Sequence, residues 1–317
     1  MGPVNMANGS EKVLVSGASG MLGSALRGGL AARKTPVLQL VRRTARVAGE
    51  LQWDPGAAEP FGQAGRLEAL EALEGLGAAI HLSGASVAGR RWTAAYKREM
   101  AASRVGSTGA LARTLAGLRK PPKALLVASA TGIYGDRGDE LLDESSAPGR
   151  GFLAELCEAW EAAARPAAEA GIRVVHLRFG VVVGPGEGAL GKMLPLFRLG
   201  LGGRLGSGRQ WMSWISLTDA VRAVLFALEN RELAGAVNLT APNPVTNAEF
   251  TRALGRAVHR PAVMPAPALA LRLALGQMAD EALLASAKAV PARLTGAGFR
   301  FEHPEIAPAL EAAVGPS

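Results

Sequence analysis

The feature that most constrains the fold of this chain is an alternation of apolar runs with helical patterns before residue 180. Five runs have the composition of buried strands: KVLVS (12–16), PVLQLV (36–41), AAIHLS (78–83), KALLVAS (123–129) and IRVVHLRF (172–179). Helical patterns lie between them, over residues 67–76, 96–118 and 153–170. Strands that are apolar on both faces and alternate with helices predict an α/β fold with a doubly wound parallel sheet.

The pattern changes after residue 180 into a stretch rich in glycine and aromatic residues, which we expect to form loops and short elements over a cleft. A helix over 217–230 and a strand over 236–240 are predicted to return to the main sheet. The next helix, over 246–258, has Thr246 or Asn247 as its cap. We therefore expect a sheet domain (11–180, with 217–240 returning to it) and a small substrate domain (181–216 and 241–317).

Composition excludes several classes of protein. Of the 317 residues 49% are apolar and 20% charged, which is typical of a globular chain. The first ten residues have no basic region or apolar core, so no secretion signal is predicted. The single Cys157 cannot form an internal disulfide, and this favours a cytoplasmic protein. The four histidines have no metal-ligand spacing and the apolar runs are short, so neither a metal nor a membrane partner is expected.

The chain is basic, with 35 Lys and Arg against 27 Asp and Glu, a net charge of +8. Nucleic-acid binding is one explanation. Against it, basic residues occur along the whole chain and aromatics make up only 5%. A pocket for an anionic cofactor and substrate explains part of the charge. We therefore predict a small-molecule substrate and no nucleic-acid partner, in a monomer or a homodimer.

A glycine motif, GASGMLG, lies between the first predicted strand and the first helix. Gly17 would make the sharp turn, Gly20 would let the backbone approach a pyrophosphate, and Gly23 would let the helix pack on the sheet. Ser19 adds a hydroxyl, and Met21 and Leu22 open the helix, whose free amides favour an anion. A mere tight turn is the alternative. In this βαβ context the motif predicts a dinucleotide-binding Rossmann fold.

The end of the second strand indicates which dinucleotide binds. NAD-binding proteins usually carry Asp or Glu there, which bonds the ribose hydroxyls. Here Arg42 and Arg43 follow the strand. Guanidinium groups bind a 2′-phosphate through charge-assisted hydrogen bonds, whereas a carboxylate would repel it. The pair predicts NADP, unless both arginines are only solvated surface residues.

With these motifs in place, the chain resembles the atypical extended short-chain dehydrogenases. It is most similar to the sugar-nucleotide-epimerase-like family, whose members have a C-terminal domain of unknown function. The resemblance runs from about residue 12 to 312. It is carried by GASGMLG, VRR, IHLSGASV, RRWT, SRVGST, SATGIYG, FLAELCEAWEAAA, RFGVVVGPGEGAL, LGSGRQWMSWI, NLTAPNPVTNAEFTRAL and VPARLTGAGFRFEHPE.

The resemblance implies an NADP-binding extended fold and further cofactor contacts. Leu82, Ser83 and Gly84, at the end of a strand, would lie along the adenosine side. Glu99 and Arg104 occupy positions that reach the nucleotide in this family. The backbone of Val182 would meet the nicotinamide amide. Ser129, at the end of its strand, completes the implied contacts.

The catalytic machinery usual in the superfamily is incomplete in this chain. That machinery is a Ser or Thr with a Tyr, whose pKa is lowered by a Lys four residues later. The Ser or Thr position aligns with Ala130, while the Tyr and Lys positions fall on Leu153 and Cys157. Thr131 could orient a substrate carbonyl. Tyr134 is a candidate acid, although its structural interpretation is favoured because this tyrosine is usually structural in extended relatives.

A second set of candidates lies in GSGRQWMSWI, where Arg209, Gln210 and Trp211 are predicted to line the substrate pocket. A packed aromatic loop is the alternative. Together the patterns predict an NADP-binding, epimerase-like oxidoreductase for a small polar substrate such as a nucleotide sugar. The alternative is an NADP-binding regulatory or scaffold protein without turnover, since some family members are associated with cell division.

Overall fold

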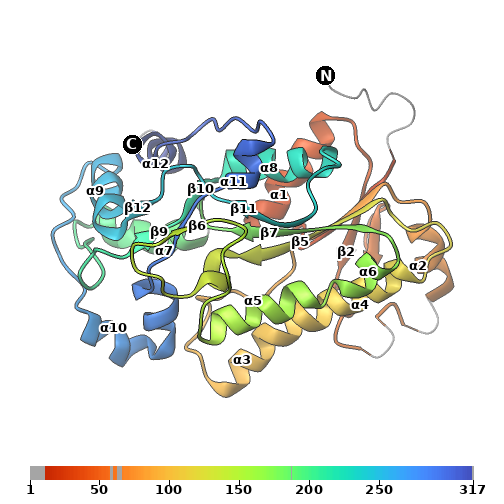
Figure 1. Ribbon diagram of the computed structural model, residues 1–317, viewed down its shortest axis with the longest axis horizontal. Helices are drawn as coiled ribbons and strands as arrows, with labels where there is room; N and C mark the ends of the chain where they lie inside the picture. The colour runs from red at the N-terminus through yellow and green to blue at the C-terminus, as the bar shows by residue number, and fades with distance from the viewer. Residues whose placement is uncertain (1–10, 58–59, 63–65, 187, 316–317) are drawn as a thin grey trace.

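The structure, a computed structural model, describes residues 11–57, 60–62, 66–186 and 188–315 (Figure 1). The leader expected at residues 1–10 lies outside this range. Within it, a seven-stranded parallel sheet forms the centre, in the order β11-β7-β5-β4-β1-β2-β3. The bounds are β1 (Val13–Ser16), β2 (Val37–Val41), β3 (Glu50–Gln52), β4 (Ala78–His81), β5 (Ala124–Ala130), β7 (Arg173–Phe179) and β11 (Gly235–Leu239).

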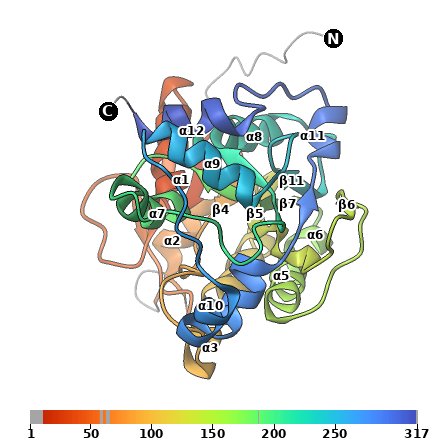
Figure 2. The same ribbon diagram turned by 90° about the vertical axis from the view of Figure 1, so that its left-hand side faces the viewer.

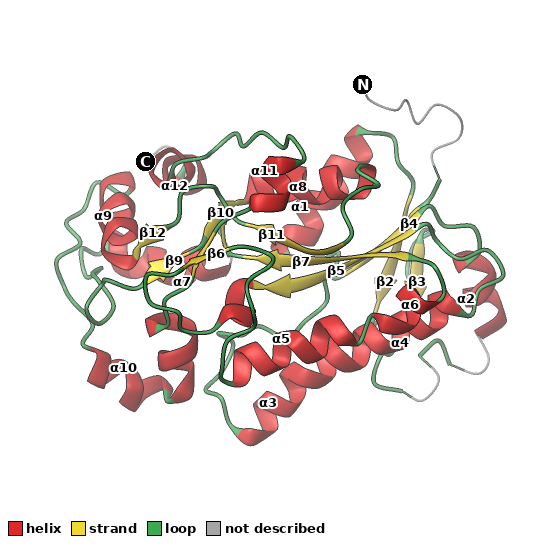
Figure 3. Cartoon of the chain, viewed as in Figure 1, coloured by secondary structure: helices red, strands yellow, loops and turns green. Residues whose placement is uncertain are grey.

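Helices cover both faces of this sheet, because the strands are apolar on both sides. On one face α1 (Met21–Ala32) and α8 (Leu217–Glu229) bury their apolar residues against β1, β4, β5, β7 and β11. On the other face lie α2 (Arg66–Leu73), α4 (Ser107–Ala116), α5 (Phe152–Ala162) and α6 (Arg165–Glu169). Figure 3 shows the two helical layers. The predicted doubly wound Rossmann-type fold is confirmed.

The helix predicted over 96–118 is built from three consecutive pieces. These are α3 (Ala94–Ala101), a π-helical turn η1 (Ala102–Gly106) and α4. Such π turns are frequent at functional sites. This one carries Arg104 into the interior, where the residue is only 8% exposed.

A second apolar core lies beside the carboxyl edge of the sheet, at the left of Figure 1. It joins α7 (Gly188–Arg198), α9 (Asn247–Ala257) and α12 (Ile306–Val314) to β8 (Val181–Val183) and β10 (Trp214–Ser216). The expectation of only loops and short elements before residue 216 was wrong at α7. This helix forms because Leu190, Leu194 and Phe197 recur at helical spacing and are buried, despite Pro195.

Two local interactions hold this second core in place. Thr246 caps α9 in a capping box with Glu249, which decides between the two predicted caps. Asp219, fully buried in α8, accepts hydrogen bonds from the amides of Glu302 and His303, both at 2.8 Å. The carboxylate therefore ties the segment before α12 to the sheet domain. None of the helices among the described residues has the length and apolar character needed to cross a bilayer.

Candidate cofactor and active site

The glycine turn after β1 admits no side chain at two of its three glycines. Gly17 has a φ of +70°, and a Cβ there would lie 2.8 Å from the carbonyl carbon of Leu82. A Cβ on Gly23 would lie 2.1 Å from the carbonyl oxygen of Gly17. A Cβ on Gly20 would meet no protein atom closer than 3.7 Å. Packing alone therefore does not require Gly20, and its missing side chain leaves room for a ligand's close approach.

An open pocket of about 600 Å³ lies in front of this turn. Gly20 is the N-cap of α1 and its helix has no side-chain cap, so the first amides of the helix are left for a ligand. The lining residues come from three parts of the chain: Ser19, Gly20, Met21, Ser24, Ala25, Pro185, Gly186 and Leu217. Ser19, Gly20 and Met21 were predicted, and the other five were not. For Pro185 and Gly186 the only signal was the glycine-rich GPGEG after β8.

Arg42 and Arg43 differ in their surroundings. Arg42 is exposed and makes no side-chain hydrogen bond or ion pair within the described residues. Arg43 donates to both carboxylate oxygens of Glu50, at 2.7 and 2.5 Å, and to the carbonyl of Thr44. The hydrogen bond from Arg43 lowers the pKa of Glu50 to about 2. Arg43 is therefore held in place and its charge balanced, while Arg42 is available.

Gly84, which follows β4, contacts the buried guanidinium of Arg104. A Cβ on Gly84 would lie 3.3 Å from the Cζ of Arg104. That guanidinium donates to the carbonyl of Ala85 at 2.8 Å and lies 5.1 Å from the ring centre of Trp160. Burial lowers its pKa. Within the described chain no carboxylate pairs with it, so Arg104 can attract a polar or anionic ligand beyond the end of β4.

Glu99 does not share this location. It lies on the outer side of α3, its side chain 51% exposed and 3.7 Å from Arg90. The prediction that Glu99 and Arg104 act on the same nucleotide thus stays a prediction. Val182 pairs with Ile215 between β8 and β10, behind the turn that leads to Gly186.

Leu153 and Cys157 on α5, which the sequence aligns with the superfamily's Tyr and Lys, cannot relay a proton. A Cβ on Gly132 would lie 3.5 Å from the Cβ of Leu153, so this side chain packs on η2 (Thr131–Tyr134), beside the half-buried Thr131. Cys157 is 3% exposed, and burial raises its pKa to about 12. Both positions are therefore inert in acid–base chemistry near neutral pH.

A buried polar network holds Ser129 and Tyr134. Ser129 donates to Glu161 at 2.7 Å, and Arg178 donates to both oxygens of Glu161. The Tyr134 hydroxyl donates to Asn238 at 2.7 Å and accepts from Arg178 at 3.1 Å. Tyr134 is fully buried, and burial raises its pKa. This geometry favours the structural interpretation of Tyr134. The hydroxyl of Ser129 already donates its hydrogen bond to Glu161, so its predicted cofactor contact stays a prediction.

The three predicted substrate residues lie near the C-terminal segment. Gln210 is 7% exposed and donates to the carbonyls of Leu205 and Leu283. The Trp211 indole donates to Asp139 at 2.7 Å. The ammonium of Lys288 lies 4.1 Å from the centre of that ring. Arg209 is exposed. The packed-loop alternative is favoured for Gln210 and Trp211, and a substrate role remains a prediction.

No three His, Cys, Asp or Glu side chains gather as a metal site in the described part of the chain. His81 is enclosed by two hydroxyls, with Nδ1 2.6 Å from Ser16 and Nε2 3.0 Å from Ser107. Its pKa falls to about 4 because of burial, so the imidazole is neutral at pH 7.

The sheet order, the glycine turn and the pocket at its carboxyl edge define a Rossmann-type protein of the short-chain dehydrogenase class. A sequence model of the NAD dependent epimerase/dehydratase family matches residues 13–239, and one of a domain of unknown function, DUF1731, matches 266–313. The chain belongs to the NAD dependent epimerase/dehydratase family, and the resemblance inferred from its motifs is confirmed.

Relatives match over nearly the whole chain. The epimerase family protein MT2273 of Mycobacterium tuberculosis is 47% identical over 300 residues, which cover 94% of this chain and 96% of the relative. The human epimerase family protein SDR39U1 is 35% identical over 303 residues, covering 95% and 98%. A crystal structure of human SDR39U1 (isoform 2) with NADPH superimposes with a TM-score of 0.86 at 34% identity, covering 95% and 98% of the two chains.

Proposed function

We propose that this chain binds NADP and acts as an epimerase-like oxidoreductase on a small polar substrate such as a nucleotide sugar. The observation that carries the proposal is the glycine turn with the unpaired Arg42 at the same edge of the sheet. The structure of the human relative with NADPH supports the choice of cofactor. The segments 181–216 and 241–317 are proposed to bind the substrate.

The residues present fit the cofactor. The backbone of Gly20, Met21 and Leu22 would hold the pyrophosphate, Arg42 the 2′-phosphate, and Arg104 a polar group beyond the end of β4. Nicotinamide, when bound, supplies or accepts a hydride. The half-buried Thr131, at the start of η2, is proposed to orient a carbonyl group of the substrate. The family-typical proton relay is replaced by an aliphatic side chain and a buried thiol, so we propose that the proton comes from outside α5.

Calorimetric titration with NADPH and NADH tests the cofactor choice. Arg42→Gln should weaken NADPH binding about tenfold and leave NADH unchanged, because a hydrogen bond to a charged group contributes about 1.5–3 kcal/mol. Glu50→Gln should strengthen NADPH binding, on the order of fivefold, because it releases Arg43 and removes a negative charge. Arg165→Gln, on the exposed surface of α6, is the control. Equal effects on both nucleotides would refute the 2′-phosphate contact.

The alternative is an NADP-binding regulatory or scaffold protein, and the loss of both Tyr and Lys favours it. A panel of carbonyl compounds and nucleotide sugars, monitored by NADPH absorbance, separates the two functions. Turnover of any member supports the oxidoreductase. Tight NADPH binding with no turnover across the panel would favour the regulatory protein.

A further inference from the structure

Two segments of the C-terminal half carry basic residues and no acidic ones. Residues 188–210 and 250–279 contain four Lys or Arg each and no Asp or Glu. Basic residues occur along the whole chain, and residues 12–49 also carry seven Lys or Arg and no Asp or Glu. The segments 188–210 and 250–279 differ from that stretch because many exposed apolar side chains accompany their basic residues.

The two segments lie side by side, and we call their exposed residues the basic–apolar surface. The amide of Met264 donates to the carbonyl of Gly202 at 3.1 Å, and that of Ala266 to Arg204 at 2.9 Å. The Arg260 side chain donates to the carbonyl of Arg198. Figure 2 shows α7, α10 (Ala268–Leu275) and the chain between α9 and α10 on the same side of the molecule.

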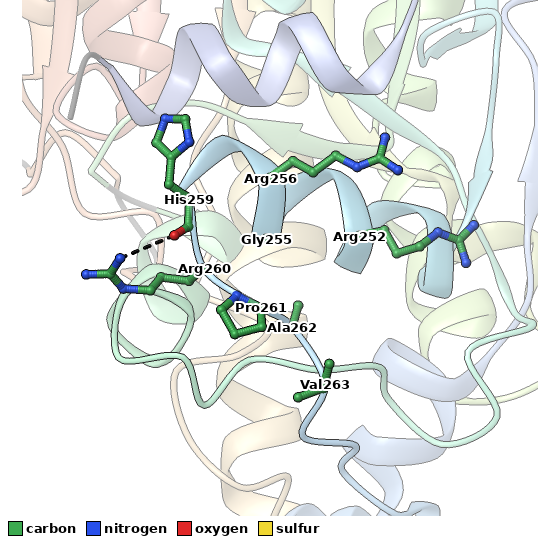
Figure 4. A pocket seen from close by; sticks show the side chains of 8 residues that line it. All are labelled: Arg252, Gly255, Arg256, His259, Arg260, Pro261, Ala262 and Val263. Atoms are coloured by element: carbon green, nitrogen blue, oxygen red, sulfur yellow. Dashed lines mark hydrogen bonds between the residues drawn. The ribbon is translucent and has the colours of Figure 1, made fainter.

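A groove of about 610 Å³ in this surface is lined by three arginines and a histidine (Figure 4). Arg252 and Arg256 project from α9, and His259 and Arg260 follow it. None of its described lining residues is a carboxylate. The two carboxylates at the borders of the second segment are engaged. Glu249 bonds Thr246 in the capping box, and Asp280 bonds Arg272 at 2.7 Å.

Exposed aliphatic side chains gather on the same surface. Of the ten large apolar side chains that are most exposed in the described chain, seven belong to these two segments, with exposures of 53–72%. They are Leu196, Leu199, Leu201, Val263, Met264, Leu269 and Leu273. The helix α10, ALALRLAL, buries none of its residues. Such a short apolar helix is poorly stabilised in water unless a partner covers it.

We propose that the basic–apolar surface docks on an anionic phospholipid membrane, with the leucines of α10 in the interface and the arginines on the headgroups. Exposed aliphatic residues mixed with basic residues are what such an interface binds. Nucleic acid is disfavoured as the partner because it would leave the leucines in water. The exposed apolar residues of this surface also include no aromatic side chain on which bases could stack. A second copy would bring two like-charged surfaces together. The inference revises the prediction of no membrane partner and needs no spanning helix.

Vesicle flotation with the full chain tests the proposal, using phosphatidylcholine vesicles with or without one third phosphatidylglycerol. We expect binding only to the anionic vesicles. Arg256→Gln with Arg260→Gln should weaken it about thirtyfold, because each basic residue near such a surface contributes about fivefold. Leu269→Ser with Leu273→Ser should weaken it about tenfold or more, since both side chains lose their insertion.

Matched controls alter exposed residues outside the two segments. Arg165→Gln with Arg300→Gln removes the same charge, and Leu67→Ser with Leu141→Ser removes the same apolar area. Both controls should float like the unmodified protein, and circular dichroism should show all variants folded. Equal binding to neutral and anionic vesicles, or unchanged flotation of the surface variants, would overturn the proposal. Binding to a DNA duplex that ignores the leucine changes, without vesicle binding, would also overturn it.

Discussion

The hydroxyl of Tyr134 satisfies two partners inside the protein, Asn238 and Arg178. Tyr134→Phe should therefore lower the free energy of unfolding by about 1–3 kcal/mol, because it leaves buried polar groups without a partner. NADPH affinity should not change. Urea unfolding and calorimetry check both statements. Tyr96→Phe is the control, since that hydroxyl bonds a single carbonyl, of Ser86, and should cost less. Loss of NADPH-dependent turnover at unchanged stability would instead identify Tyr134 as the acid.

His81 makes stability depend on pH. Its pKa is about 4 in the folded chain because it is fully buried, against 6.5 when unfolded. Between these values the unfolded chain binds more protons, so stability is present above pH 6.5 and is lost as the pH falls toward 4. The full difference corresponds to roughly 3 kcal/mol.

The free energy of unfolding, measured by urea at several values between pH 7 and pH 4, checks this expectation. His81→Asn removes the titrating group, so the slope of stability against pH should become shallower than in the unmodified chain. His259→Asn, the same substitution at an exposed position, is the matched control. Parallel slopes in all three proteins would mean that His81 is not the group responsible.

At the scale of elements, α5 carries Leu153 and Cys157 where the sequence predicts the superfamily's Tyr and Lys positions. Its thiol, Cys157, is 3% exposed with a pKa of about 12. Native protein at pH 8 should therefore react with an aromatic disulfide reagent only as fast as it unfolds, whereas denatured protein should release one equivalent at once. Rapid labelling of the native chain would show that α5 opens locally around this residue.

The elements that could be predicted were those whose apolar pattern is local. The five long strands and α8 follow from apolar runs, and α9 from its cap at Thr246. The short β3 escaped prediction because Glu50–Gln52 has no strand pattern and depends on pairing with β2. The helix α7 escaped because glycines surround it, and its burial depends on Phe250 and Leu310, distant in sequence.

At the scale of the whole molecule, the candidate site was predictable on one side only. The turn at Gly17 and the arginines after β2 are sequence-local features. The opposite wall of the pocket, Pro185, Gly186 and Leu217, reaches the turn only through the fold. The pairing of Arg43 with Glu50 depends on the contact of β2 with β3. The hydrogen bond from Ser129 to Glu161 likewise forms only when β5 and α5 pack together, with Arg178 of β7 beside them.

Because its walls come from α1, the loop after β8 and the start of α8, the pocket joins the sheet to the second core. A nucleotide bound there should stabilise both together by mass action, about 2.7 kcal/mol at a hundredfold excess over Kd. For a chain of this size that raises Tm by roughly 4 °C. Differential scanning calorimetry should show one transition moving as a whole, further with NADPH than with NADH. In Arg42→Gln the two nucleotides should shift Tm equally. A shift confined to part of the transition would place the nucleotide on the sheet domain alone.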